Sequence, residues 1–428
     1  MQDAHDPYAA LRHRDYGLLL SSNVLAATAG EMQFAAVEWE LFERTGLPEY
    51  LGYGGLAQFL PVLLLGLPAG QLADRLSRKY LLMTAHLILL LASLGLATVS
   101  VLAPLDGFDT LDWPKWAILG LMVVAGCSRA LGMPTRSSLI PLVVPVEAVG
   151  NAVTWTSSGW QTARVGGSAL GGLFIAVTGS PGVVYVATAG GLLFCIGIVA
   201  FIRPRPAGNW REPRTLRTLL AGVRFVWNSP VLLAAITLDL FAVLLGGATA
   251  LLPMYATDIL RVGPVGFGWL RAAEAIGAFA MAMVLAHRAP MQRPGRALLW
   301  AVAGFGVTII VFGLSENFAL SFVMLVTMGA LDNISVVIRG TLMQVLTPDE
   351  MRGRVGAVNS VFIVSTNQLG AFESGITAKW WGPVGAVVVG GVGTLVVVVA
   401  AALYWPRLRE LGPIHKTIDE EHQQHQRK

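Results

Sequence analysis

The stretch Gly70-Gln71-Leu72-Ala73-Asp74-Arg75-Leu76-Ser77-Arg78-Lys79 lies between two long apolar runs, residues 50–69 and 80–103. Each run has about the 20 residues that a helix rising 1.5 Å per residue needs to cross ~30 Å of hydrocarbon. A connection this short predicts that the two helices are antiparallel neighbours. Its three basic residues predict that it faces the cytoplasm, because cytoplasmic loops carry an excess of Lys and Arg.

The composition of the whole chain excludes a soluble core. Only 13% of the 428 residues are charged and 54% are apolar, whereas a soluble domain carries about 25% charged residues. Cys127 and Cys195 lie inside apolar runs, so neither a disulfide framework nor a zinc site is expected. The net charge of +4 is too small for a nucleic-acid surface. We therefore expect a polytopic membrane protein without a cofactor, a metal centre or a nucleic-acid partner.

Twelve apolar runs are long enough to span a bilayer. They cover residues 16–42, 50–73, 80–103, 116–137, 149–178, 183–202, 231–256, 265–286, 297–314, 318–346, 355–378 and 384–405. Of the 30 Lys and Arg residues, we assign four to membrane depth, four to loops on one side and 22 to the side that holds both termini, including Arg136 at the cytoplasmic end of its run. This asymmetry predicts that both termini are cytoplasmic and that the protein is a multi-pass protein of the cell inner membrane.

The two halves of the chain resemble each other. Residues 51–56 recur as residues 265–270, and residues 136–150 match residues 339–353. A duplicated six-span unit is a common plan for secondary transporters. We therefore predict an all-α membrane protein of twelve transmembrane helices in two pseudo-symmetric six-helix bundles. The predicted domains are an N-terminal bundle (1–202), a cytoplasmic linker with an amphipathic helix (203–230), and a C-terminal bundle with a cytoplasmic tail (231–428).

The charged connection resembles the signature loop between the second and third helices of the major facilitator superfamily, Gly-x-x-x-Asp-Arg-x-Gly-Arg-Arg. Ser77 replaces the second Gly of that pattern. The residues that match it are Gly70, Asp74, Arg75, Arg78 and Lys79. A carboxylate at this place can accept hydrogen bonds from an Arg or from a helix N-terminus. We interpret the loop as a conformational clamp, and the alternative is a solvated positive-inside loop. The repeat-related residues Glu350, Arg352 and Arg354 belong to the same predicted clamp.

Further motifs are similar to the enterobactin-exporter-like and macrolide-efflux-like branch of the superfamily. They are residues 11–16, 30–33, 57–61, 151–167 and 348–354. The resemblance implies a transporter that exports siderophores, macrolides, other amphipathic drugs or, in some members, metal ions. It also implies alternating access in a monomer. Glu31 stands where that branch usually has Trp, which places an acidic group in the first helix.

Ionisable groups at membrane depth are the strongest site candidates, because each costs about 2.5–3.5 kcal/mol even on the lenient insertion scale. The proton-coupling and cavity candidates are Glu31, Arg129, Asp239, Asp332, Arg164 and Glu373. We assign proton binding to Glu31 and Asp332, with Arg129 as their counter-charge, because low-dielectric surroundings favour the neutral form of a carboxylate. The alternative is a set of static salt bridges. Glu38 and Glu40 are expected to be hydrated at the outer end of helix one, and Arg271 to pair with Glu274.

Polar and aromatic side chains at similar depth suit an amphipathic organic substrate. The substrate-binding candidates are Gln33, Gln58, Trp155, Trp160 and Asn333. Hydrogen bonding between helices is the alternative role for the polar members of this set. The spacing Gly167-x-x-x-Gly171 predicts close helix packing.

The sequence therefore predicts a proton-coupled exporter, with small-molecule substrate, protons and the bilayer as its partners. A divalent-metal exporter is one alternative, for which His415, His422 and His425 in the C-terminal tail are candidate ligands. A lysophospholipid transporter is another. A membrane enzyme would need clustered His or Asp at one membrane face, which the sequence lacks, and a non-transporting receptor is disfavoured by the charges at membrane depth.

Overall fold

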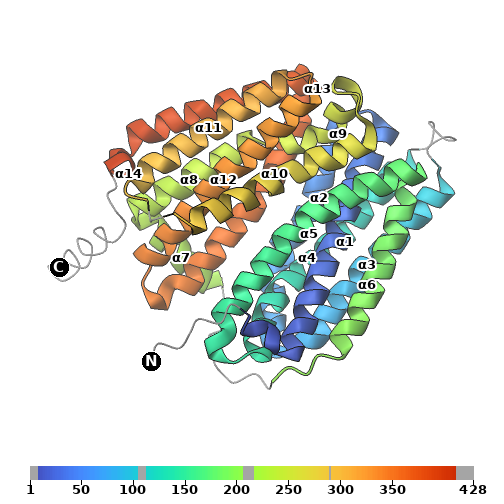
Figure 1. Cartoon of the computed structure of the whole chain (residues 1–428), viewed down its shortest axis with the longest axis horizontal. Coiled ribbons are helices and arrows are strands. Elements are labelled where there is room, and N and C mark those ends of the chain that lie inside the picture. Colours follow the sequence, from blue (N-terminus) through green and yellow to red (C-terminus); the bar gives the residue numbers. More distant parts are fainter. Residues whose placement is uncertain (1–7, 105–111, 206–215, 289–290, 411–428) are drawn as a thin grey trace. The chain divides into compact units, whose positions relative to one another are not determined.

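The computed structural model describes residues 8–104, 112–205, 216–288 and 291–410. Within these ranges every regular element is a helix (Figure 1). The chain divides into two compact units. The first contains the chain up to Gly46, Ala57–Arg214 and Gly263–Ala272, and the second contains Leu47–Leu56, Thr215–Val262 and the chain from Ala273 onward. Two helices, α2 and α10, therefore contribute residues to both units.

Helices cover all the predicted apolar runs. The long helices before the linker are α1 (Arg14–Thr45), α2 (Pro48–Arg75), α3 (Arg78–Leu102), α4 (Trp113–Val143), α5 (Val149–Thr178) and α6 (Pro181–Ala200). Those after it are α7 (Leu216–Asn228), α8 (Pro230–Leu245), α10 (Gly263–Ala286), α11 (Pro294–Leu314), α12 (Phe318–Leu346) and α13 (Asp349–Tyr404). The remaining described elements are short helical segments: η1 (Ala10–Arg12), η2 (Val146–Ala148), η3 (Ala248–Leu251), α9 (Leu252–Met254), η4 (Tyr255–Ile259) and α14 (Pro406–Glu410).

Eight helical segments of the described residues are long and apolar enough to cross a membrane. Helices α1, α2 and α5 are 32, 28 and 30 residues long respectively. The predicted spans 355–378 and 384–405 are the two parts of α13, which breaks at Gly382 (φ +73°) immediately before Pro383. The total of twelve membrane crossings stays a prediction.

The charged connection that opened the sequence analysis is a tight turn. Helix α2 ends at Arg75 and α3 begins at Arg78, so only Leu76 and Ser77 lie between them. Lys79 donates a hydrogen bond of 2.6 Å to the carbonyl oxygen of Ala200, the last residue of α6. A cation is favourable there because the carbonyl groups at a helix C-terminus are unpaired and partly negative.

The predicted clamp itself stays a prediction. The side chains of Asp74, Arg75, Glu350, Arg352 and Arg354 lie outside the described part of the structure.

In the first unit, α1 packs against α5 and α6, and α3 packs against α4 and α6 (Figure 1). The crossing of α1 and α5 is close because α5 carries glycine there. A Cβ atom on Gly167 would lie 2.6 Å from the carbonyl oxygen of Thr28 and 2.8 Å from Cβ of Glu31. A Cβ atom on Gly171 would lie 3.1 Å from the carbonyl oxygen of Met32. The predicted small-residue packing is confirmed, and it fixes the position of Glu31 in the unit.

In the second unit, α11 packs against α12 and α13, and α13 packs against α8. The predicted span 231–256 is not one continuous helix. Helix α8 ends at Leu245, and Gly246-Gly247 separates it from η3, α9 and the π-helical turn η4. A Cβ atom on Gly247 would overlap the backbone of Gly370 in α13. The glycine pair permits this approach and interrupts the helix at the same place.

Each unit contains a similar glycine crossing. A Cβ atom on Gly126 of α4 would overlap the carbonyl oxygen of Gln58 on α2, and one on Gly329 of α12 would overlap that of Glu274 on α10. Gly126 and Gly329 are 203 residues apart, the spacing of the repeat in the sequence. The crossings agree with the duplication inferred from the sequence.

The linker of the predicted domains contains α7, as expected. Its Val226 is buried against the core of the second unit, which includes Leu232 and Leu298, while Leu220 and Trp227 are exposed. Residues 206–215 of the linker lie outside the described residues.

Candidate functional site

The first candidate site is a pair of carboxylates on α1 that share one guanidinium. Glu31, Phe34 and Glu38 are spaced three, four and seven residues apart, so the helix presents them on one face. Arg271 of α10 forms an ion pair and a hydrogen bond with Glu38. Its second terminal nitrogen lies 3.9 Å from Oε2 of Glu31. The guanidinium also lies 4.6 Å from the centre of the Phe34 ring, within the range of a cation–π interaction.

These three charged side chains are largely removed from solvent. The exposed fractions are 14% for Arg271, 19% for Glu31 and 10% for Glu38. The Arg271 guanidinium is shared by two carboxylates, and Glu38 makes the closer contact. The expectation of a hydrated Glu38 is therefore wrong. Arg271 reaches back to α1, a partner that sequence spacing could not indicate.

Arg129 of α4 belongs to the same unit. Its Nη1 donates a hydrogen bond of 3.0 Å to Oε1 of Gln58 on α2. Glu31 attracts the Arg129 charge, and Arg164 on α5 repels it. The first unit therefore brings together four of the sequence-predicted residues, and it places Glu31 in the field of two guanidiniums.

The second unit holds Asp239 of α8 in an ion pair with Arg339 of α12. Asp239 also accepts a hydrogen bond of 3.0 Å from the Ser335 hydroxyl. A small pocket lies beside this pair, and Asp332 lines it with Asp239 and Ser335. Its other lining residues are apolar: Ala242, Val243, Val302, Phe305 and Leu331. Asp332, Ser335 and Arg339 share one face of α12, as their i, i+3 and i+7 spacing indicates.

Replacing Arg339 by Met is expected to destabilise the protein by about 3–5 kcal/mol, because it leaves the Asp239 carboxylate buried without its cation. The side chains of this pair are 5% and 13% exposed. Thermal unfolding in detergent measures the change, with the exposed Arg296→Met on α11 as control. Adding Asp239→Asn to Arg339→Met is expected to restore part of the loss. Equal melting temperatures for Arg339→Met and the control Arg296→Met would contradict the pairing.

The described contacts do not bring the predicted substrate-binding residues together at one site. Gln33 is 5% exposed and accepts a hydrogen bond of 2.5 Å from Ser93 on α3. Trp155 contacts the ring of Tyr8, with 5.9 Å between ring centres. Trp160 is 38% exposed, and the buried Oδ1 of Asn333 has no hydrogen-bond partner among the described residues. Glu373 lies on α13, where the Ser374 hydroxyl is 3.4 Å from its carboxylate.

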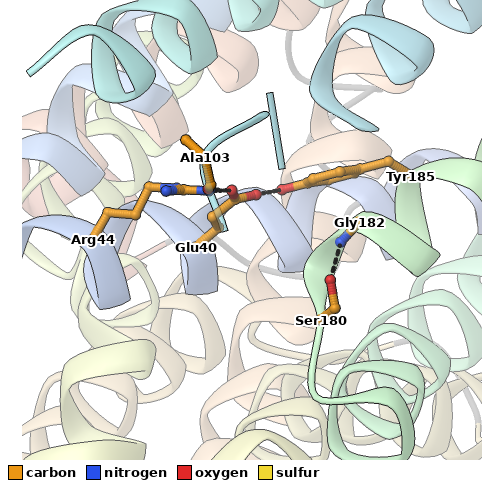
Figure 2. A network of polar contacts seen from close by, with 6 residues as sticks. All are labelled: Glu40, Arg44, Ala103, Ser180, Gly182 and Tyr185. Atoms are coloured by element: carbon orange, nitrogen blue, oxygen red, sulfur yellow. Dashed lines mark hydrogen bonds and ion pairs between the residues drawn. The ribbon is translucent and has the colours of Figure 1, made fainter. Parts of the chain in front are cut away.

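A further acidic residue of α1, Glu40, forms a buried network that the sequence did not indicate. Figure 2 shows its carboxylate between Arg44 and Tyr185. The Arg44 guanidinium donates from Nε at 2.8 Å and from Nη2 at 2.5 Å, and the Tyr185 hydroxyl donates at 2.6 Å. Arg44 Nη2 also donates to the carbonyl oxygen of Ala103 at 2.7 Å. Glu40 is 0% exposed, so the expectation of a hydrated carboxylate is wrong. The network ties α1 to α6 and to the end of α3.

Replacing Tyr185 by Phe is expected to lower stability by about 1.5–3 kcal/mol, the usual contribution of a hydrogen bond to a charged group. Tyr404→Phe is the matched control, because Tyr404 is 83% exposed. Thermal unfolding of both variants checks this prediction. An unchanged melting temperature for Tyr185→Phe would show that the hydroxyl does not support Glu40.

The described residues contain no group of three or more His, Cys, Asp or Glu side chains that could hold a metal ion. His415, His422 and His425 lie outside the described residues.

Comparisons with a family model and with individual proteins both find similarity to membrane export proteins. A family model described as transmembrane secretion effector matches residues 5–425. The multidrug efflux pump Tap of Mycolicibacterium fortuitum is 28% identical over 413 residues, covering 92% of this chain and 96% of Tap. The enterobactin exporter EntS of Shigella dysenteriae serotype 1 is 26% identical over 343 residues, covering 79% of each chain.

Solved structures give the same fold. A bacterial homologue of the human lysosomal transporter Spinster, in an inward-facing and occupied conformation, has a TM-score of 0.68 at 16% identity and covers 95% of this chain and 97% of its own. A D-xylose-proton symporter has a TM-score of 0.69 at 12% identity, covering 92% of this chain and 99% of its own. At these identities the likeness concerns the fold alone.

Proposed function

The chain belongs to the transmembrane secretion effectors, a family of major facilitator superfamily transporters, and from this premise we propose that it exports a small amphipathic organic molecule in exchange for protons. It is a multi-pass membrane transporter and not an enzyme. The two relatives described above are a multidrug efflux pump and an enterobactin exporter, and both names support an organic substrate that leaves the cell. We place the protein in the inner membrane as a monomer with both termini in the cytoplasm.

The observation that carries proton coupling is the convergence of Glu31 and Glu38 on Arg271. Glu38 holds the guanidinium directly, so Glu31 is the carboxylate that can gain and lose a proton without breaking the closest ion pair. Arg129 supplies a second counter-charge to the ionised form. Protonation of Glu31 removes its attraction for both guanidiniums and leaves Glu38 as the carboxylate that holds Arg271.

This change acts on a helix that the two units share. Residues Gly263–Ala272 of α10 belong to the first unit, and the remainder of α10 belongs to the second. Arg271 and Gly268 lie within this shared segment, where Gly268 contacts Gly172 of α5. In the proposed alternating-access cycle, protonation of Glu31 weakens the hold of α1 on this segment and lets it separate from α1. Asp239 and Asp332, which line the pocket of the second unit, form the proposed second charged site. The charged turn after α2 is the proposed conformational clamp.

Transport by purified protein in liposomes tests the function. A panel of amphipathic drugs and catechol siderophores is offered with and without an imposed pH gradient. We expect movement of at least one organic compound against its own gradient only while the pH gradient is present, and loss of this movement when a protonophore is added. Transport that ignores the pH gradient would contradict proton coupling. Movement of a divalent metal ion with none of the organic compounds would favour the metal exporter instead.

A further inference from the structure

A recessed surface of the first unit is lined mainly by basic side chains, and the proposed transport cycle does not use it. Its lining consists of Arg12, His13, Arg14, Asp15, Leu142, Val143, Arg203 and Arg205. Four guanidiniums therefore face one carboxylate. The four Arg side chains are exposed, so they are accessible to a ligand. Like charges at this density repel one another, and an anion bound among them would relieve the repulsion.

Backbone hydrogen bonds hold the walls of this pocket together. The backbone N–H of Arg205 donates to the carbonyl oxygen of Leu142 at 3.0 Å, which ties the segment after α6 to the end of α4. The backbone N–H of Arg203 approaches Oδ1 of Asp15 at 3.4 Å. The pocket is thus formed by the chain itself, and the one carboxylate is engaged in part by a backbone donor rather than by a guanidinium.

The ends of three helices set the depth of the pocket in the membrane. Helix α1 begins at Arg14, α4 ends at Val143, and α6 ends at Ala200. Leu142 and Val143 of α4 are the apolar lining residues, and the rest of the lining consists of Arg, His and Asp side chains. A basic pocket at the ends of membrane helices lies at the level of the lipid headgroups.

We propose that this pocket binds the phosphate of an anionic lipid headgroup. Guanidinium groups donate paired hydrogen bonds that match phosphate oxygens, and Arg is the residue best suited to this geometry. Leu142 is partly exposed and can contact the start of an acyl chain, whereas Val143 is buried in the core of the first unit. A soluble phosphate offers the same charged group without the chains, so the two sources can be separated by experiment.

The test uses the purified full chain in neutral detergent. Native mass spectrometry and thermal unfolding are recorded with phosphatidylglycerol, with phosphatidylcholine, and with inorganic phosphate. The pocket variant replaces Arg12, Arg14, Arg203 and Arg205 by Gln, which leaves the backbone hydrogen bonds available. The control variant replaces Arg288, Arg293 and Arg296 by Gln, which are exposed basic residues of the second unit.

We expect phosphatidylglycerol to bind and to raise the melting temperature, and phosphatidylcholine to do neither. The pocket variant is expected to bind phosphatidylglycerol at least about ten-fold more weakly, since it lacks the four positive charges that attract the phosphate. The control variant is expected to bind as the parent does. Equal affinity of the pocket variant and the parent would overturn the proposal. Binding of inorganic phosphate in the pocket without binding of phosphatidylglycerol would overturn its assignment to lipid.

Discussion

Proton-driven transport is expected to fall to the level of empty liposomes when Glu31 is replaced by Gln. The amide cannot carry the proton that the proposed exchange requires. Glu38 continues to neutralise Arg271 in this variant, because the Glu38 ion pair is the closer of the two. Folding is therefore expected to be retained, with a smaller loss of stability than that expected for Arg339→Met. Uptake driven by an imposed pH gradient measures the effect, and thermal unfolding measures the stability.

Two variants separate a role in coupling from a merely structural role. Glu31→Asp keeps a titratable group and is expected to retain part of the proton-driven transport. Glu316→Gln removes an exposed carboxylate from the turn between α11 and α12 and is expected to change nothing. Full activity of Glu31→Gln would reject the proposed role of Glu31. A loss of folded protein in Glu31→Gln would instead assign Glu31 to the packing of α1.

The second large effect is expected from Gly329→Ala on α12. The added methyl group would overlap the carbonyl oxygen of Glu274 on α10. Backbone atoms of two packed helices cannot yield as a side chain can, so the helices must separate. Overpacking of this kind typically lowers stability by about 1–3 kcal/mol, and sometimes by more. We expect a lower melting temperature in detergent and a smaller yield of folded protein.

Gly340→Ala, on the same helix, is the matched control. Among the described residues, no atom beyond its chain neighbours and the adjacent backbone of its own helix lies within 4 Å of the position that its Cβ would occupy. Alanine in a helix interior is more stable than glycine by about 0.5–1 kcal/mol, so this variant is expected to be neutral or stabilised. Opposite signs for the two substitutions would confirm the close crossing of α10 and α12. A Gly329→Ala variant as stable as the parent would contradict it.

Much of the molecule could be predicted from the sequence because membrane helices have strong local signals. Long apolar runs, short charged turns and the internal repeat were sufficient to indicate a helical membrane transporter and its family. The short connection before residue 80, the division between the runs 355–378 and 384–405, and the close packing at Gly167 were confirmed. The interruption of the span 231–256 at Gly246-Gly247 was missed, because hydropathy does not distinguish a straight helix from a broken one.

The choice of ion-pair partners is where prediction from the sequence failed. Spacing matched Arg271 with Glu274 on its own helix, whereas Arg271 lies against Glu38 and Glu31, which are more than 200 residues away in the chain. Glu40 was expected in water and is buried beneath Arg44 and Tyr185. Helical spacing reports which residues share a face, but it carries no information about which other helix that face meets.

The sequence by itself determined the class of protein, its helices and the rare charges at membrane depth. This is possible because each polar or charged group placed in hydrocarbon has its own free-energy cost, which depends on the type of residue. Only the tertiary structure decided which charges neutralise one another. The pairing depends on where glycines such as Gly167 and Gly329 let helices approach each other. In this protein Asp239 pairs with Arg339, and both Glu31 and Glu38 lie against Arg271.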